Sequence, residues 1–174
     1  MKIKKLLIVS VYLFVMVAVS CSFSLAEEKA TPEEVLNLIL EGVPVIEQLG
    51  ADGLKAFSDP KGEFVFKDTY IYVVDCEKMI VLAHPNTKLI GIEVKNLEDK
   101  NPDPSKRIIH NNLLCEVGKR PYGGWVEYYW EKLGEDKPSR KISFSILAPN
   151  TNYALISGIY DDNTSVEELN SKLK

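Results

Sequence analysis

Aromatic side chains crowd the segment Gly123–Trp130, and this segment constrains the fold more than any other. It opens with a glycine pair and continues Trp-Val-Glu-Tyr-Tyr-Trp. Side chains alternate between the two faces of a strand, which places Val126, Tyr128 and Trp130 on one face and Trp125, Glu127 and Tyr129 on the other. Neither face is wholly polar, so the pattern predicts a central strand in a sheet covered on both sides. The rings are then either ordinary core or the lining of a cavity.

The first residues have the composition of an export signal. Met1–Lys5 carries three lysines, and the following run from Leu6 to Val19 is apolar but short for a membrane span. We expect a signal peptide over residues 1–26, cleaved after Ala26. An alternative is a lipobox that ends at Cys21, which would then carry a lipid. The mature chain, residues 27–174, is expected to form one domain.

Charge and length limit the function classes. The whole chain has 21 basic and 25 acidic residues. Removing residues 1–26 takes away three lysines and no acid, which leaves 18 basic residues and a net charge of −7. Nucleic acid is therefore not an expected partner. No second apolar segment follows the signal, so we expect neither a further membrane span nor an output region.

Cysteines and histidines give no metal or haem signature. Cys76 and Cys115 remain after the signal, and in an oxidising compartment they can form a disulfide; the alternative is two separate buried thiols. Neither belongs to a Cys-x-x-Cys pair, and His84 and His110 lie 26 residues apart. We expect no metal site and no cofactor.

The remaining pattern predicts an α+β fold. Thr31-Pro32 begins a long helix whose apolar stripe reaches Leu49, with a kink or break expected at Gly42 and Pro44. Short strands with period-two patterning follow, and one shorter helix is expected between the third and fourth of them. The predicted strands are 64–66, 70–75, 79–84, 125–130, 141–147 and 153–160, the inserted helix lies within 104–117, and a final short helix opens at 164–169. This is a PAS-like antiparallel sheet of five or six strands with a long N-terminal helix.

Four segments, taken in order, resemble a single Cache domain of type 2, the PAS-like extracellular sensor module of bacterial chemoreceptors and histidine kinases. The segments are Tyr70–Asp75, the corner Ala83–Asn86 with Gly91, Gly124–Trp130, and Lys141–Phe144 leading to Gly158–Asp162. The chain departs from the family where Pro102-Asp103-Pro104 replaces a usual glycine, and where no second membrane helix or signalling region follows.

The resemblance implies a function without catalysis. Such domains bind small organic acids such as acetate, propionate, pyruvate or lactate in a pocket on the sheet. The chain would then be a periplasmic or lipid-anchored binding protein that presents its ligand to a membrane signalling protein. Phosphate-binding glycine loops and a Gly-x-Ser-x-Gly elbow are missing from the sequence, which also disfavours an enzyme. The alternative is an interaction protein that keeps the fold with a filled pocket; the oligomeric state stays open.

An anion within aromatic walls needs a cation or several donors, because a bare carboxylate in a dry pocket is costly. Lys141 is the first candidate for this charge, and Ser143 shares its strand face. The alternative for Lys141 is a solvated edge charge. His84 precedes Pro85 and could donate to the ligand or only cap the corner.

Aromatic rings are the candidates for the pocket wall. Tyr72, Tyr128 and Trp130 are preferred, and further candidates for the lining are Tyr70, Trp125 and Tyr160. Arg107 and His110, on the inserted helix, could close the pocket from above, although exposed helix charges are the more ordinary interpretation.

Overall fold

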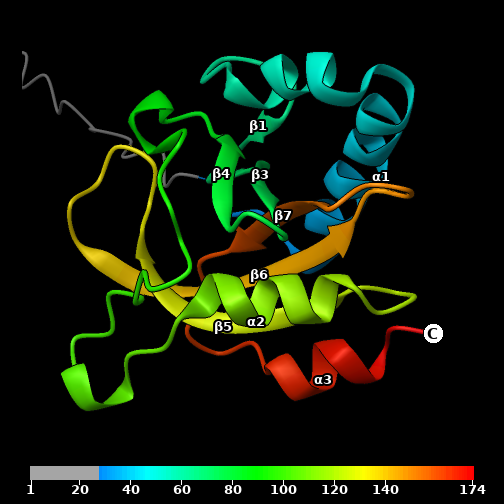
Figure 1. Cartoon of the computed structure of the whole chain (residues 1–174). Coiled ribbons are helices and arrows are strands. Elements are labelled where there is room, and N and C mark those ends of the chain that lie inside the picture. Colours follow the sequence, from blue (N-terminus) through cyan, green and yellow to red (C-terminus); the bar gives the residue numbers. More distant parts are fainter. Residues whose placement is uncertain (1–27) are drawn as a thin grey trace, which may run out of the picture.

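The computed structural model describes residues 28–174. Its centre is an antiparallel five-stranded sheet in the order β4-β3-β7-β6-β5 (Figure 1). The strands are β3 (Tyr72–Asp75), β4 (Ile80–Ala83), β5 (Gly124–Glu131), β6 (Pro138–Leu147) and β7 (Tyr153–Ile159). The predicted α+β fold, a PAS-like antiparallel sheet with an N-terminal helix, is confirmed.

Helix α1 (Pro32–Leu49) begins at a capping box, in which Thr31 and Glu34 each bond the other's backbone N–H. A kink or a break was expected at Gly42 and Pro44; the helix runs unbroken through both residues, so a break is wrong and the kink stays a prediction. Gly42 lets the helix pack closely on the sheet, because a Cβ there would lie 2.8 Å from Cδ1 of Ile71 and would make the side chains around it shift. A 3₁₀ helix, η1 (Gly50–Ser58), follows directly.

The sheet separates two apolar cores. Helix α1 covers one face, where Ile39, Phe57, Ile71, Phe144 and Leu155 are buried together. Helix α2 (His110–Gly118) lies across β5 and β6 on the other face (Figure 1). The core on the α2 side contains Tyr70, Tyr72, Val74, Leu114, Tyr128 and Ile156. The buried aromatic residues of this second core are tyrosines, and the candidate site lies in it.

Strand β5 is an edge strand, so the predicted central position is wrong. Both faces are nevertheless covered, which explains its apolar pattern. Helix α3 (Val166–Ser171) packs on the α1 side of β5, where Asn170 bonds both the N–H and the carbonyl of Trp125 at 2.9 and 3.0 Å. The free edge is partly paired by a loop, since the Lys100 N–H donates to the Tyr129 carbonyl.

Two predicted elements are shorter than expected. The strand predicted over 70–75 is divided: β2 (Thr69–Tyr70) pairs with β1 (Val65–Phe66) in a separate small sheet, and β3 begins at Tyr72. The helix predicted within 104–117 has only a 3₁₀ turn, η3 (Pro104–Lys106), before α2. Residues 107–109 stay extended because Ile108 exchanges backbone and side-chain hydrogen bonds with Asp99.

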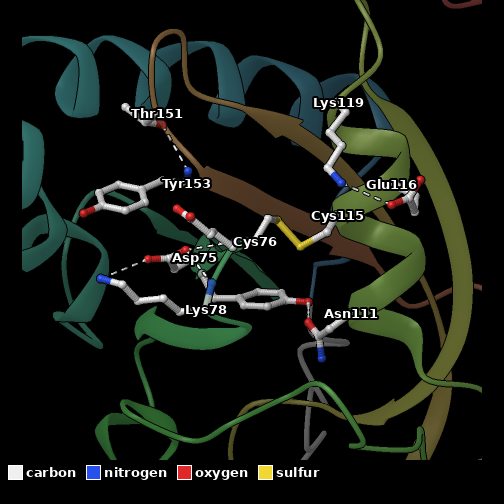
Figure 2. The surroundings of a disulfide bond; sticks show 11 residues. Asp75, Cys76, Lys78, Asn111, Cys115, Glu116, Lys119, Thr151 and Tyr153 are labelled. Carbon is white, nitrogen blue, oxygen red and sulfur yellow. Dashed lines mark hydrogen bonds and ion pairs between the residues drawn. A yellow bond between two sulfur atoms is a disulfide. The ribbon is translucent and has the colours of Figure 1, made fainter.

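A disulfide joins the end of β3 to α2. The sulfur atoms of Cys76 and Cys115 are bonded, and their Cα atoms lie 5.6 Å apart (Figure 2). Cys76 begins the turn that joins the antiparallel strands β3 and β4. The bond therefore ties the middle of the sheet to the helix that covers it.

The predictions for the first residues lie outside the described part of the chain. They are the signal peptide over residues 1–26 and the lipobox at Cys21. Within residues 28–174, no helix combines the length and apolarity needed to cross a membrane.

Candidate functional site

A small cavity of about 30 Å³ lies in the core on the α2 side. Strands β2, β3, β4, β5 and β6, the loop after β4 and the first turn of α2 all contribute to its wall. The lining residues are Tyr70, Tyr72, Val81, His84, Leu89, Ile92, Val94, Leu97, His110, Asn111, Tyr128, Trp130 and Lys141. A volume of this size exceeds what one water molecule requires, so the cavity has room for a small molecule of a few atoms.

Lys141 is the one cation in this lining, which contains no acidic side chain. Its position on β6 directs it to the α2 side of the sheet, and only 1% of the residue is exposed. The Nζ atom donates to the hydroxyl of Tyr70 at 3.2 Å. It also lies 4.3 and 4.7 Å from the ring centres of Tyr70 and Tyr160. These contacts are cation–π interactions, which compensate only part of the cost of a buried charge.

None of the ion pairs among the described residues includes Lys141. A buried ammonium without a carboxylate is unusual, because burial of a charge is costly unless the charge is paired. The predicted alternative, a solvated edge charge paired with a neighbouring acid, is therefore wrong.

His84 contributes a neutral donor. Its Nδ1 accepts the Asn86 N–H at 2.8 Å, so the ring proton of the neutral form lies on Nε2. Burial lowers the pKa of His84 to about 3, and the charge of Lys141 adds to this shift. The ring packs against Tyr70 and Tyr72, with centres 4.9 and 5.6 Å apart. At neutral pH, His84 therefore brings an N–H to the cavity wall without a second charge.

The first turn of α2 supplies two further polar side chains. His110 and Asn111 are each 2% exposed, and both line the cavity. Their Nε2 and Nδ2 atoms are 3.0 Å apart, and the Tyr72 hydroxyl donates to Oδ1 of Asn111 at 3.4 Å. Burial lowers the pKa of His110 to about 4, although Asp99 opposes the shift. The interpretation of His110 as an exposed helix charge is therefore wrong.

Tyr128 and Trp130 form one wall, as the alternation in β5 predicted. The Tyr128 ring stacks on His110 with centres 4.4 Å apart, and Trp130 lies 5.0 Å from the same imidazole. Burial raises the pKa of Tyr128 to about 12, so its hydroxyl keeps its proton at neutral pH. That hydroxyl lies 2.9 Å from Oγ of Ser143.

Four predicted site residues lie outside the lining. Ser143 is on the expected face of β6 but sits behind the Tyr128 hydroxyl. Tyr160 sits behind Lys141, and its hydroxyl donates to the Glu131 carbonyl at 2.7 Å. Trp125 points to the α1 side, because it alternates with Tyr128, and packs on Phe144. Arg107 is held outside by a bond from Nε to the Asn101 carbonyl at 3.1 Å.

Sequence reasoning missed Asn111 and the apolar part of the wall. The apolar residues are Val81 on β4 and, after it, Leu89, Ile92, Val94 and Leu97. The last four lie in a segment without regular strands. The secondary-structure propensities of its residues therefore do not predict that it lies beside the cavity. One signal was present: Ile90, Ile92 and Val94 alternate with Gly91 and Glu93, as in a strand. The structure pairs this segment with β4 through a bridge between Ile80 and Glu93.

The arrangement suits a small anion. The cavity is lined by one cation, by neutral N–H and O–H groups and by apolar side chains. A carboxylate or similar group would neutralise the charge of Lys141. Among residues 28–174, no three His, Cys, Asp or Glu side chains are grouped to hold a metal ion.

Comparison with known proteins identifies the family. The sequence model of the Cache domain family matches residues 61–165. Similar solved structures share the fold. One, described as showing carboxylic acid recognition by a Cache chemosensory domain, is 23% identical with a TM-score of 0.60, covering 75% of this chain and 92% of its own.

Two further structures come from chemotaxis proteins. A methyl-accepting chemotaxis protein from Vibrio parahaemolyticus is 19% identical with a TM-score of 0.60, covering 75% of this chain and 88% of its own. A periplasmic sensor domain of a chemotaxis protein is 23% identical with a TM-score of 0.56, covering 75% of this chain and 90% of its own. At these sequence identities, the structural similarity supports a shared fold and nothing further.

Proposed function

Because this chain belongs to the Cache domain family, we propose that it is a sensor domain that binds a small monocarboxylate in the cavity beside Lys141. The observation that carries the proposal is the buried ammonium of Lys141, which has no acidic neighbour in the cavity lining. A carboxylate placed there would form a charge-assisted hydrogen bond in a site shielded from water. We expect binding without catalysis.

The polarity of the lining favours one carboxylate per ligand. Lys141 is the single cation in the lining, so a second carboxylate would be buried without a partner, which is costly. Val81, Val94 and Leu97 make part of the lining apolar, which suits a short hydrocarbon tail. Acetate and propionate fit this pattern best, followed by pyruvate and lactate. The similar Cache chemosensory domain described as recognising carboxylic acids supports this ligand class.

The alternative of an interaction protein with a filled pocket is less well supported. That alternative requires rings to occupy the space beside Lys141, whereas a cavity of about 30 Å³ remains there.

The test is a thermal-shift screen of the purified protein against formate, acetate, propionate, pyruvate, lactate and succinate. Acetamide and propionamide serve as matched controls, because they keep the size of the acids without the charge. A ligand at 100 times its dissociation constant adds about 2.7 kcal/mol to stability, which raises Tm by several degrees in a domain of this size. Shifts by the monocarboxylates alone support the proposal, and equal shifts by the amides, or none at all, contradict it.

The location we propose is outside the cytoplasm, with a membrane signalling protein as partner. The basic and apolar start of the sequence and the disulfide between Cys76 and Cys115 support export. A similar structure is also described as a periplasmic sensor domain. Mass spectrometry of the protein isolated from its host tests this. A chain that starts at Glu27 indicates cleavage after Ala26, a lipid on Cys21 indicates anchoring, and an intact Met1 contradicts export by cleavage.

A further inference from the structure

We propose that the Cys76–Cys115 disulfide is a positioning element of the ligand site: it holds His110 and Asn111 against the cavity, so that ligand affinity depends on the redox state of this bond. The inference rests on the proposed function for its affinity readout. Its structural part, the placement of the first turn of α2, can be measured without a ligand.

Two cross-links connect the same two elements. Cys115 lies four residues after Asn111, so both project from one face of α2. Tyr72 and Cys76 are separated by the same number of residues along β3 and the turn that follows it. The Tyr72 hydroxyl bonds Asn111. Cys76 bonds Cys115 (Figure 2). The hydrogen bond at the cavity is long, at 3.4 Å, so the covalent link one helical turn away is the stronger restraint.

At the start of α2, Tyr72, Asn111 and His110 form a chain of hydrogen bonds in which each residue donates to the next. Because the Tyr72 hydroxyl donates to Oδ1 of Asn111, the Nδ2 atom of Asn111 is left to donate to Nε2 of His110. The neutral imidazole of His110 therefore carries its proton on Nδ1. That atom is buried and has no hydrogen-bond partner in the described residues.

An unpaired buried donor is costly, and a ligand oxygen that accepts from it recovers this cost. His110 lines the cavity together with Lys141, so a carboxylate held by Lys141 lies within the same enclosure. We assign the Nδ1–H group of His110 as the second polar contact of the ligand. Asn111 fixes the tautomer of this imidazole, and the disulfide fixes Asn111.

Reduction should loosen this arrangement without unfolding the domain. An external dithiol breaks the S–S bond, delivers two electrons and two protons to Cys76 and Cys115, and becomes a cyclic disulfide. Leu114 and Val117 still pack α2 on the sheet. The first turn of the helix, however, is then held only by non-covalent contacts. These are the Tyr72–Asn111 bond, the stacking of His110 on Tyr128, the bond from Asn112 to the Lys95 carbonyl and the Asp99–Ile108 bonds just before the helix.

The experiment compares acetate binding to the oxidised and the dithiothreitol-reduced protein by calorimetry. We expect affinity to fall about fivefold or more, the equivalent of at least one net hydrogen bond. The variant Cys76→Ala/Cys115→Ala should bind like the reduced protein and should not respond to the reductant. Ile39→Ala, in the core on the α1 side, is the matched control: it lowers stability but should leave affinity unchanged.

His110→Phe separates positioning from general destabilisation. This variant keeps a ring against Tyr128 but lacks the donor, so reduction should change its affinity much less than that of the wild type. An equal effect of reduction in both proteins would overturn the assignment of His110.

The structural part is tested by hydrogen exchange of the amides of residues 113–115, which donate to the carbonyls of the first turn of α2. Faster exchange on reduction, confined to this turn, is expected. Equal exchange in both redox states overturns the inference, even if no carboxylate binds. Absence of binding to the oxidised protein would instead count against the proposed function.

Discussion

The ammonium group of Lys141 lies 3.2 Å from the hydroxyl oxygen of Tyr70 and 4.3 Å from the centre of the same ring. Tyr70 is thus the main neighbour of a charge that has no acidic partner in its cavity. A neutral hydroxyl and an aromatic face stabilise the buried lysine without neutralising it. The charge stays available to an anion that enters the cavity.

Tyr70→Phe should destabilise the unliganded protein by about 2 kcal/mol, because the buried ammonium loses its hydroxyl acceptor. Chemical denaturation measures this difference. Tyr153→Phe is the control, since its half-buried ring lies on the α1 side and its loss should stay within about 0.5 kcal/mol. Equal effects of the two substitutions would show that the Tyr70 hydroxyl does not support Lys141.

Val94→Ala should shift ligand preference toward longer acids. Val94 is 1% exposed and lines the cavity, so its truncation enlarges the space for the hydrocarbon tail. We expect butyrate to gain affinity relative to acetate, at a cost in stability of about 2 kcal/mol. Val73→Ala should cost a similar amount on the other side of the sheet without changing the order of ligands. An unchanged order of ligand affinities in Val94→Ala would show that the hydrocarbon tail of the ligand does not lie against Val94.

Stability should fall as the pH is lowered below neutrality. Burial lowers the pKa of His84 to about 3 and that of His110 to about 4, whereas both titrate near 6.5 when unfolded. Between these values the unfolded chain binds more protons, so the free energy of unfolding decreases with falling pH, by about 1.4 kcal/mol per pH unit for each histidine. The window runs from about pH 6.5 down to pH 4. Denaturation at several pH values measures this slope.

His84→Gln should lower that slope by about 1.4 kcal/mol per pH unit in the same window, because one of the two histidines no longer titrates. Carboxylates contribute to acid sensitivity in both proteins, so the difference between them is the informative quantity. A slope that is the same in the variant and the wild type would mean that His84 is accessible to protons when folded.

Asp99→Asn should destabilise the loop that leads to α2. The Asp99 carboxylate accepts the Ile108 N–H at 3.1 Å and the Tyr129 N–H at 2.9 Å, so an amide can satisfy only one of them. We expect a loss of about 2 kcal/mol, with faster exchange of the amide that loses its acceptor. Asp103→Asn, at an exposed turn, is the control and should have a much smaller effect. Equal losses of stability in Asp99→Asn and Asp103→Asn would show that Asp99 does not anchor this loop.

The period-two pattern was sufficient to predict the sheet and the faces of β5, because alternation follows directly from strand geometry. Tyr128 and Trp130 therefore appear where they were expected, with Trp125 on the opposite face. The edge position of β5 could not be predicted, because a loop and α3 cover the strand as another strand would. Strand order depends on long-range pairing, which local patterns do not encode.

The candidate site was predictable where it lies on regular strands. Lys141 lies on β6 and Tyr72 on β3, two strands that both pair with β7, and both residues line the cavity; His84 follows from the corner at the end of β4. The apolar residues after β4 were missed because they lie in a segment without regular strands. Asn111 was missed because tertiary contacts, in particular those of Asp99, decide where α2 begins. Arg107 fell outside the cavity for the same reason, since it precedes the helix instead of belonging to it.

Lys141 is the proposed carboxylate receptor, and the function proposed for this domain depends on it. The most direct measurement is titration calorimetry of acetate and propionate into the wild type, Lys141→Met and Lys119→Met. Methionine keeps much of the apolar volume of lysine, and Lys119 is an exposed control that pairs with Glu116 on α2. We predict that Lys141→Met loses binding by tenfold to a hundredfold or more, since a hydrogen bond to a charged group contributes about 1.5–3 kcal/mol. Lys119→Met should bind like the wild type. Carboxylate binding of wild-type strength in Lys141→Met would contradict the account.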